Sequence, residues 1–230
     1  MKEIAHLRSI TLWIFIVPFL AINICLVLIT QFHGLFPNQE HVIANTIPYF
    51  DGGTSISRTA RVFPTYLIFK PAMFFTSYLL YKYWIYNKKI ILNFSDENKN
   101  LNKIIFFGIG SAVLLSLHSI FLGIKFDIAI YKLFRKLVIL SFITFELAAQ
   151  AYLVVTLYKM KNKFLNYINF NILKIKAILI SVLIMVALLS LPIVAAPGNK
   201  FFKHALEWNY FVGVLIFYLL TFLMWKNKQQ

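Results

Sequence analysis

Six long apolar stretches, separated by shorter polar connections, constrain this chain more than any other feature. A helix that crosses the hydrocarbon core of a bilayer needs about 20 mainly apolar residues. Hydrophobic residues make up 60% of the chain and charged residues only 13%. The sequence therefore predicts an all-α, polytopic membrane protein with a single domain over residues 1–230. The six expected spans cover residues 11–31, 63–84, 104–123, 134–158, 175–195 and 205–225.

The basic residues predict how these spans are oriented. Lysine and arginine are enriched in the cytoplasmic loops of membrane proteins. Most of the 23 such residues fall on one side of the membrane if the N-terminus is cytosolic, with Lys174 and Lys176 among them. Both termini are therefore expected in the cytosol, and residues 32–62 form one long outer loop. The expected location is an endomembrane (Golgi or ER) or the plasma membrane.

The net positive charge does not indicate a nucleic-acid-binding protein. The formal net charge is +15, but the cations are distributed over short loops, where they set topology and contact anionic lipid headgroups. A nucleic-acid-binding protein needs a basic soluble face, and this chain has no room for one. The expected partners are membrane lipids and other membrane proteins, with no nucleic acid.

The sequence carries no strong catalytic or metal-binding motif. It has no HExxH, no P-loop and no nucleophile elbow. The five histidines are scattered, and the single cysteine, Cys25, supplies no metal cluster. We therefore expect no metal and no cofactor, and the sequence leaves open whether the protein is an enzyme.

The outer loop at residues 32–62 is expected to be ordered. A connection of this length in a compact domain is usually functional or disordered. This one contains Ile43, Ile47, Tyr49 and Phe50 but few charges, which argues against disorder. We expect it to pack over the outer mouth of the helix bundle.

Three ionisable residues fall well inside the predicted spans, away from their ends, where such groups are costly and mark functional sites. At a rise of about 1.5 Å per residue, Lys70 lies about 10 Å and His118 about 8 Å from the outer ends of their spans. Glu146 lies deeper, at about 18 Å. The sequence predicts that all three face one cavity open toward the outer leaflet, below Asp51 of the loop. A Lys70–Glu146 pair would neutralise both charges.

Each of these residues also has a structural interpretation. Lys70 can extend to the outer interface without a partner. Glu146 can hydrogen-bond Gln150 one turn further along its helix. His118, beside two serines, fits a hydrogen-bonded packing residue. Glu207, which precedes Trp208, is explained by its position near a helix N-terminus.

The loop segment Pro48-Tyr49-Phe50-Asp51-Gly52-Gly53 resembles the first-loop signature of the Frag1/DRAM/Sfk1 family of six-span membrane proteins. In that family a stretch containing proline and arginine leads to the second span, as residues 58–64 do here. An acidic residue followed by an aromatic marks the last span, here Glu207-Trp208. The chain departs from the family at the start of the fourth span, where Phe134 and Arg135 replace a common histidine.

The resemblance implies a role in lipid handling, in GPI-anchor lipid remodelling or in membrane lipid organisation. The chain is most similar in form to the GPI-remodelling branch. On this interpretation Asp51 and Glu207 hold the loop against the last span. Arg58 and Arg61 order the loop or contact a phosphate, and Gly52 and Gly53 permit turns that a side chain would block.

Three other functions remain open from the sequence. The first is an enzyme that acts on a lipid acyl or amide bond through His118. The second is a channel or transporter with the Lys70–Glu146 pair in its path. The third is a membrane adaptor that recruits cytosolic proteins through its lysine-rich inner loops.

Overall fold

The structure is a computed structural model, and it describes residues 2–43, 45–94, 99–124 and 128–226. The described part is all-helical, apart from one isolated bridge between Ile168 and Trp225. The long helices are α1 (Lys2–Gln31), α3 (Tyr66–Phe94), α4 (Leu101–Phe121), α5 (Ala129–Lys159), α7 (Phe170–Ala195) and α8 (Lys200–Met224). The short ones are η1 (His33–Leu35), η2 (Gln39–His41), α2 (Ile56–Ala60) and α6 (Lys161–Phe164).

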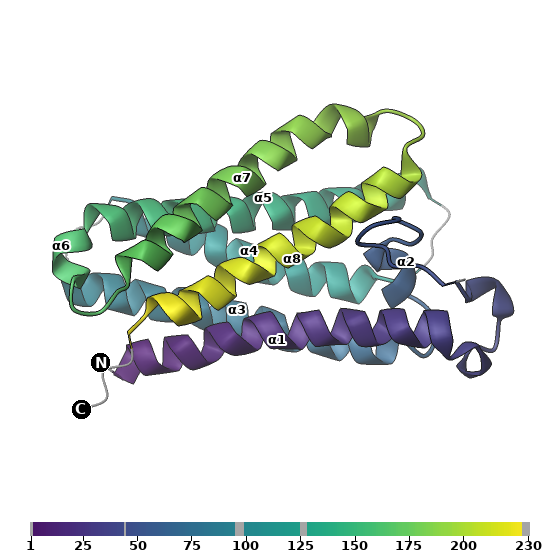
Figure 1. Cartoon of the computed structure of the whole chain (residues 1–230), viewed down its shortest axis with the longest axis horizontal. Coiled ribbons are helices and arrows are strands. Elements are labelled where there is room, and N and C mark those ends of the chain that lie inside the picture. Colours follow the sequence, from purple (N-terminus) through teal and green to yellow (C-terminus); the bar gives the residue numbers. More distant parts are fainter. Residues whose placement is uncertain (1, 44, 95–98, 125–127, 227–230) are drawn as a thin grey trace.

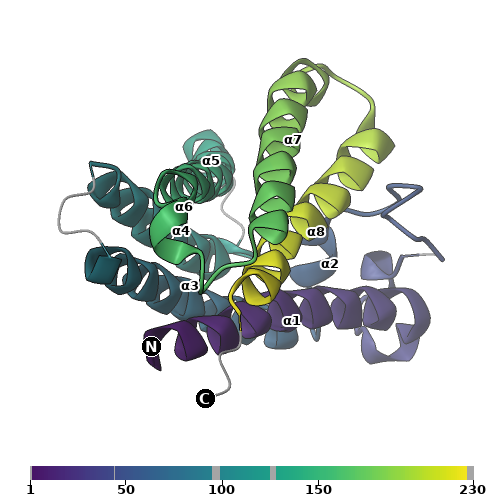
Figure 2. The ribbon, with the colours of Figure 1, turned by 60° about the vertical axis from the view of Figure 1, so that its left-hand side comes forward.

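The long helices form a closed bundle. Each packs on two others, in the order α1, α3, α4, α5, α7, α8 and back to α1. Figures 1 and 2 show that α7 leans away from α5 toward the connection with α8. Both described ends of the chain lie at one end of the bundle, called here the inner end, and α2 lies at the opposite, outer end (Figure 1).

Five of the described helices are long and apolar enough to cross a membrane, namely α1, α4, α5, α7 and α8. This indicates a multi-pass membrane protein. The expected sixth span corresponds to α3, which has 29 residues but does not belong to this set. The reason is chemical, because α3 carries four lysines, at positions 70, 82, 88 and 89, together with several tyrosines.

Helices α1 and α3 extend furthest beyond their predicted spans. Helix α1 begins at Lys2 instead of residue 11, and α3 continues past Trp84 to Phe94. Polar residues occur in both extensions, such as His6 and Asn87. A span predicted from apolarity ends where polar residues begin. The backbone hydrogen bonds of the helix do not depend on that change, and they continue into the membrane interface.

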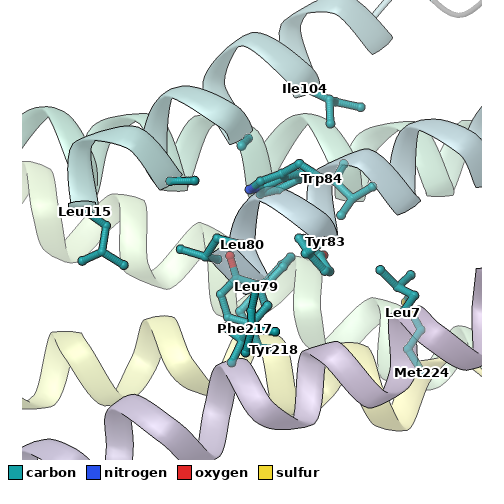
Figure 3. Close-up of a cluster of buried hydrophobic side chains, with 14 of the residues drawn as sticks. Leu7, Leu79, Leu80, Tyr83, Trp84, Ile104, Leu115, Phe217, Tyr218 and Met224 are labelled. Carbon is teal, nitrogen blue, oxygen red and sulfur yellow. The ribbon is translucent and has the colours of Figure 1, made fainter. Parts of the chain in front are cut away.

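Large aromatic residues fill the centre of the bundle. Trp84, Tyr83 and Tyr218 are fully buried, and Figure 3 shows them grouped with Phe217 between the helices. The Tyr83 ring meets the edges of Trp84 and Tyr218 at centroid distances of 4.7 and 5.1 Å. Gly108 makes room for this group, since a Cβ there would lie 2.3 Å from the Trp84 ring. Small residues thus let α3 and α4 approach closely.

Candidate functional site

The outer loop closes on itself around Asp51. The Asp51 carboxylate accepts hydrogen bonds from Thr46 Oγ1 at 2.5 Å and from the backbone nitrogens of Ile47 and Gly53, both at 2.8 Å. The Thr46 hydroxyl, with these two N–H groups, lowers the pKa of Asp51, because all three stabilise the ionised form. Residues 46–60, which comprise this turn and α2, are called the cap below.

The cap is docked on the outer part of α8. Three α8 side chains bind its backbone carbonyls: His204 Nδ1 on Gly52 O at 2.9 Å, Trp208 Nε1 on Thr54 O at 2.9 Å and Asn209 Nδ2 on Tyr49 O at 2.7 Å. The Tyr49 ring also meets Trp208 edge-on at 4.9 Å, and its hydroxyl donates to Asn23 of α1. Segments more than 150 residues apart therefore form one unit at the outer end.

Glu207 fixes the second half of the cap. Its carboxylate lies near the backbone N–H groups of Ile56 and Ser57, in the first turn of α2, and interacts electrostatically with them. From the sequence, Glu207 is interpreted as a residue near the N-terminus of its own helix. The structure instead places its carboxylate at the N-terminus of α2. Within the described part of the chain, the side-chain hydrogen bonds of Asp51 lie in the loop. Of the predicted Asp51 and Glu207 pair, only Glu207 therefore contacts the cap from the last helix, together with His204, Trp208 and Asn209.

Gly52 is required where the cap meets α8. Its φ is +62°, a left-handed value that favours glycine, and a Cβ would lie 1.7 Å from the backbone oxygen of Phe201. The neighbouring Gly53 is also tight, because its Cβ would lie 2.2 Å from Thr46 Oγ1. Gly52 therefore permits the contact of the loop with α8, and Gly53 permits the turn of the loop around Asp51.

A pocket of about 680 Å³ lies beside the cap at the outer end. Its wall comes from the first outer segment, from α2 and the residues after it, from Gly123 and from the start of α8. Its charged and titratable lining residues are Glu40, His41, Arg58, Arg61, Lys200 and His204. Val62 and Phe63 supply an apolar part of the wall, and Phe63 is 49% exposed.

The pocket has an excess of positive charge. Partial burial, followed by the charges of Arg135 and Arg58, lowers the pKa of Arg61, which nonetheless stays ionised as arginines do. Among the described residues no carboxylate forms an ion pair with Arg58, Arg61 or Lys200, and Glu40 is the single acidic residue in the wall. The nearby acids Asp51 and Glu207 are engaged by the cap itself.

The three ionisable residues predicted within spans do not line this pocket. Lys70 Nζ donates to the carbonyl of Ile120 at 3.3 Å, and it lies 5.9 Å from the centre of the Tyr66 ring. The charged neighbour of His118 is Arg135, a cation. The predicted cavity that unites Lys70, His118 and Glu146 is therefore not the cavity seen at the outer end, which the loop builds from other residues.

Glu146 belongs to a separate buried cluster in the middle of the bundle. Its carboxylate accepts from Ser111 Oγ at 2.6 Å, from Gln150 Nε2 at 2.8 Å and from the hydroxyl of Tyr218. The alternative interpretation, a bond between Glu146 and Gln150, is thus present. The predicted pair of Lys70 with Glu146 is not formed, because the two side chains have different partners.

Sequence reasoning missed Lys176, which it counted among the inner cations. Lys176 is fully buried, its Nζ donates to Thr221 Oγ1 at 2.7 Å, and it lies 4.0 Å from the centre of the Phe217 ring. A signal was present, since Leu173, Lys176, Ile180 and Leu183 are spaced as one face of a helix. The other three residues on that face are buried and apolar.

Comparisons with protein-family models, with curated proteins and with solved structures found no match for this chain. The fold by itself defines the class as an all-helical, multi-pass membrane protein with a folded cap at one end of its bundle.

Proposed function

We propose that this chain is a six-span lipid-handling protein that holds a lipid headgroup in the outer pocket. In this proposal α3 is the sixth span. At about 1.5 Å per residue its 29 residues measure about 43 Å, more than the roughly 30 Å of a bilayer core. Six spans place both termini on one side, which the distribution of basic residues assigns to the cytosol. On the basis of the resemblance to the Frag1/DRAM/Sfk1 family, the proposed role is GPI-anchor lipid remodelling or membrane lipid organisation. The proposed location is the Golgi, the ER or the plasma membrane.

The observation that carries the proposal is the composition of the outer pocket. A lipid headgroup is polar and its tails are apolar, so a site for it must combine both characters at one end of the membrane domain. The pocket combines Arg58, Arg61 and Lys200 with Val62 and the exposed ring of Phe63. Its volume, about 680 Å³, lies within the range of about 300–1,000 Å³ typical of small-molecule sites. The tails would extend along the apolar outer surface of the bundle.

The alternatives have less support. A transport path through a Lys70–Glu146 pair lacks that pair. Catalysis by His118 with an acid has no acid beside His118 among the described residues, where its charged neighbour is Arg135. Recruitment of cytosolic partners by the inner lysines has no further observation in its favour.

The proposal is tested by mapping where a lipid lies. The purified protein is incubated in mixed micelles with a diacyl lipid that carries a photoreactive group in its headgroup, and cross-linked peptides are identified by mass spectrometry. Cross-links are expected on residues 58–63 and 200–204. Reaction only elsewhere on the bundle surface, or a pattern unchanged by Phe63→Asp, would overturn the proposal. Leu67→Asp, on an exposed site outside the pocket, is the matched control.

A further inference from the structure

We propose that the outer pocket recognises a phosphate group, and that Arg58, Arg61 and Lys200 are its ligands. This inference rests on the proposed function, because it names the headgroup chemistry of the same pocket. The first observation is the net positive charge of the pocket wall. Three cations line the wall together with one carboxylate, Glu40, and Arg135 adds a further positive charge close to Arg61.

The structure explains why two nearby carboxylates of the described part of the chain do not neutralise these cations. The carboxylates of the cap and of the adjoining turn of α8 are Asp51 and Glu207. Asp51 binds one hydroxyl and two N–H groups of its own loop, and Glu207 lies beside two N–H groups in the first turn of α2. Each of these two carboxylates therefore interacts with the backbone of the cap and, within the residues that the structure describes, neither forms an ion pair with the arginines. Arg58 and Arg61 line the same pocket and their like charges repel each other, so an anion in the pocket relieves this repulsion.

The donors suit phosphate better than a single carboxylate. Each guanidinium presents a planar fork of N–H groups that matches two oxygens of a phosphate, and a lysine adds a mobile point charge. Lys200 opens α8, a helix of 25 residues whose N-cap, Asn199, makes no side-chain cap hydrogen bond. The positive end of this helix dipole adds to the field at that wall. The three cations come from two segments of the pocket wall, residues 58–61 and the start of α8.

The wall also indicates the source of the phosphate. Val62 and Phe63 lie directly after Arg61, so an apolar surface adjoins the cationic one. A free phosphate ion gains nothing from such a surface, whereas the glycerol and first methylene groups of a lipid bury apolar area there. We therefore commit to a phosphate carried by a lipid, with inorganic phosphate as the comparison.

The test measures binding of three probes to the purified protein in detergent, by native mass spectrometry and by competition with a fluorescent lipid. The probes are dioleoyl phosphatidic acid, dioleoylglycerol with the same tails and no phosphate, and inorganic phosphate. Phosphatidic acid is expected to bind at least tenfold more tightly than dioleoylglycerol, and its affinity is expected to fall steeply with salt. Arg58→Gln and Arg61→Gln are each expected to weaken it at least tenfold. Lys136→Gln, an exposed cation outside the pocket, should leave it unchanged.

The outcomes separate the inference from the proposed function. Equal binding of phosphatidic acid and dioleoylglycerol in the pocket overturns the phosphate inference and leaves a lipid site. Binding of inorganic phosphate, without either lipid, supports the phosphate ligands and overturns both the lipid source and the lipid function. Binding of no probe overturns both proposals. Thermal unfolding of each variant is measured in parallel, and an arginine variant that unfolds at the wild-type temperature but still binds phosphatidic acid normally also overturns the inference.

Discussion

Replacing Glu146 should destabilise the bundle by an amount that depends on whether the new side chain can accept hydrogen bonds. In Glu146→Leu the Tyr218 hydroxyl and Gln150 Nε2 lose their acceptor inside the bundle. The Ser111 hydroxyl keeps an acceptor, because its one proton can turn to the Gly108 carbonyl, which lies 2.8 Å away. Two buried donors are therefore left without partners, and leucine fills most of the glutamate volume, so a large cavity is not the cause.

The size of the effect follows from these two donors. An unsatisfied buried donor costs about 1–3 kcal/mol in soluble proteins. Side-chain hydrogen bonds between membrane helices are weaker, about 0.6 kcal/mol on average and about 1.7 at most. For two donors we expect a loss of about 1–4 kcal/mol in the free energy of unfolding. Glu146→Gln keeps a carbonyl oxygen for Tyr218 and Gln150, and its amide can donate to Ser111, so a change below about 1 kcal/mol is expected.

The assay is unfolding of the purified protein in mixed micelles with increasing sodium dodecyl sulfate, followed by tryptophan fluorescence and by far-UV circular dichroism. Wild type, Glu146→Leu and Glu146→Gln are compared at one protein concentration. A leucine variant as stable as the wild type would show that the cluster contributes no net stability. A glutamine variant as unstable as the leucine variant would show that negative charge, and not acceptance of hydrogen bonds, is what the cluster requires.

Three further substitutions test other parts of the structure. Gly52→Ala should undock the cap, because its Cβ would lie 1.7 Å from a backbone oxygen of α8, whereas Gly34→Ala, with nothing within 4 Å, is the control; hydrogen exchange of residues 46–60 reports the difference. The lowered pKa of Asp51 means that its contribution to cap order is present above the ordinary aspartate pKa and is lost as the pH falls through the lowered value. Limited proteolysis from about pH 7 to about pH 3 should show this loss in the wild type, and a flat profile in Asp51→Asn. Lys176→Met should leave the free energy of unfolding unchanged or raise it, because a buried amine is removed and the Thr221 hydroxyl still donates to a backbone carbonyl; a fall of more than about 1 kcal/mol in the same detergent assay would refute this.

The helical architecture could be predicted because it depends on a property of each segment alone. Any apolar stretch of sufficient length must satisfy its backbone hydrogen bonds within a helix, and five of the expected spans correspond to helices of that kind. The order of the cap could be predicted for a related reason. Its apolar residues and its two adjacent glycines indicated an ordered loop with special backbone geometry, and Gly52 has such geometry.

Partners between helices could not be predicted in the same way. A position along a span gives depth, through the rise per residue, but it does not say which neighbouring helix a side chain faces. Depth alone made a Lys70–Glu146 pair reasonable, yet Lys70 binds α4 at Ile120 and Glu146 is bound by Ser111, Gln150 and Tyr218. No charge or motif marks a tyrosine as the partner of a carboxylate.

Lys176 shows a second limit of the sequence. Lysines near the ends of spans are usually solvated and set topology, so Lys174 and Lys176 received the same interpretation although two helical positions apart. The structure exposes Lys174 and buries Lys176. The distinction is one of angle around the helix axis, about 200° between such positions in an α-helix. It becomes visible only when the apolar residues of the same helix are arranged by face.

The bond between Tyr218 and Glu146 has a consequence for synthesis of the protein. The two residues are 72 positions apart, and the tyrosine is made last. At about 5–20 residues per second, the ribosome needs about 4–14 s to reach it after the glutamate. Before Tyr218 is made, the ribosome has translated two of the three side-chain donors to this carboxylate, Ser111 and Gln150. Glu146 therefore leaves the ribosome before its last hydrogen-bond donor has been synthesised. The cluster is complete only when α8 inserts.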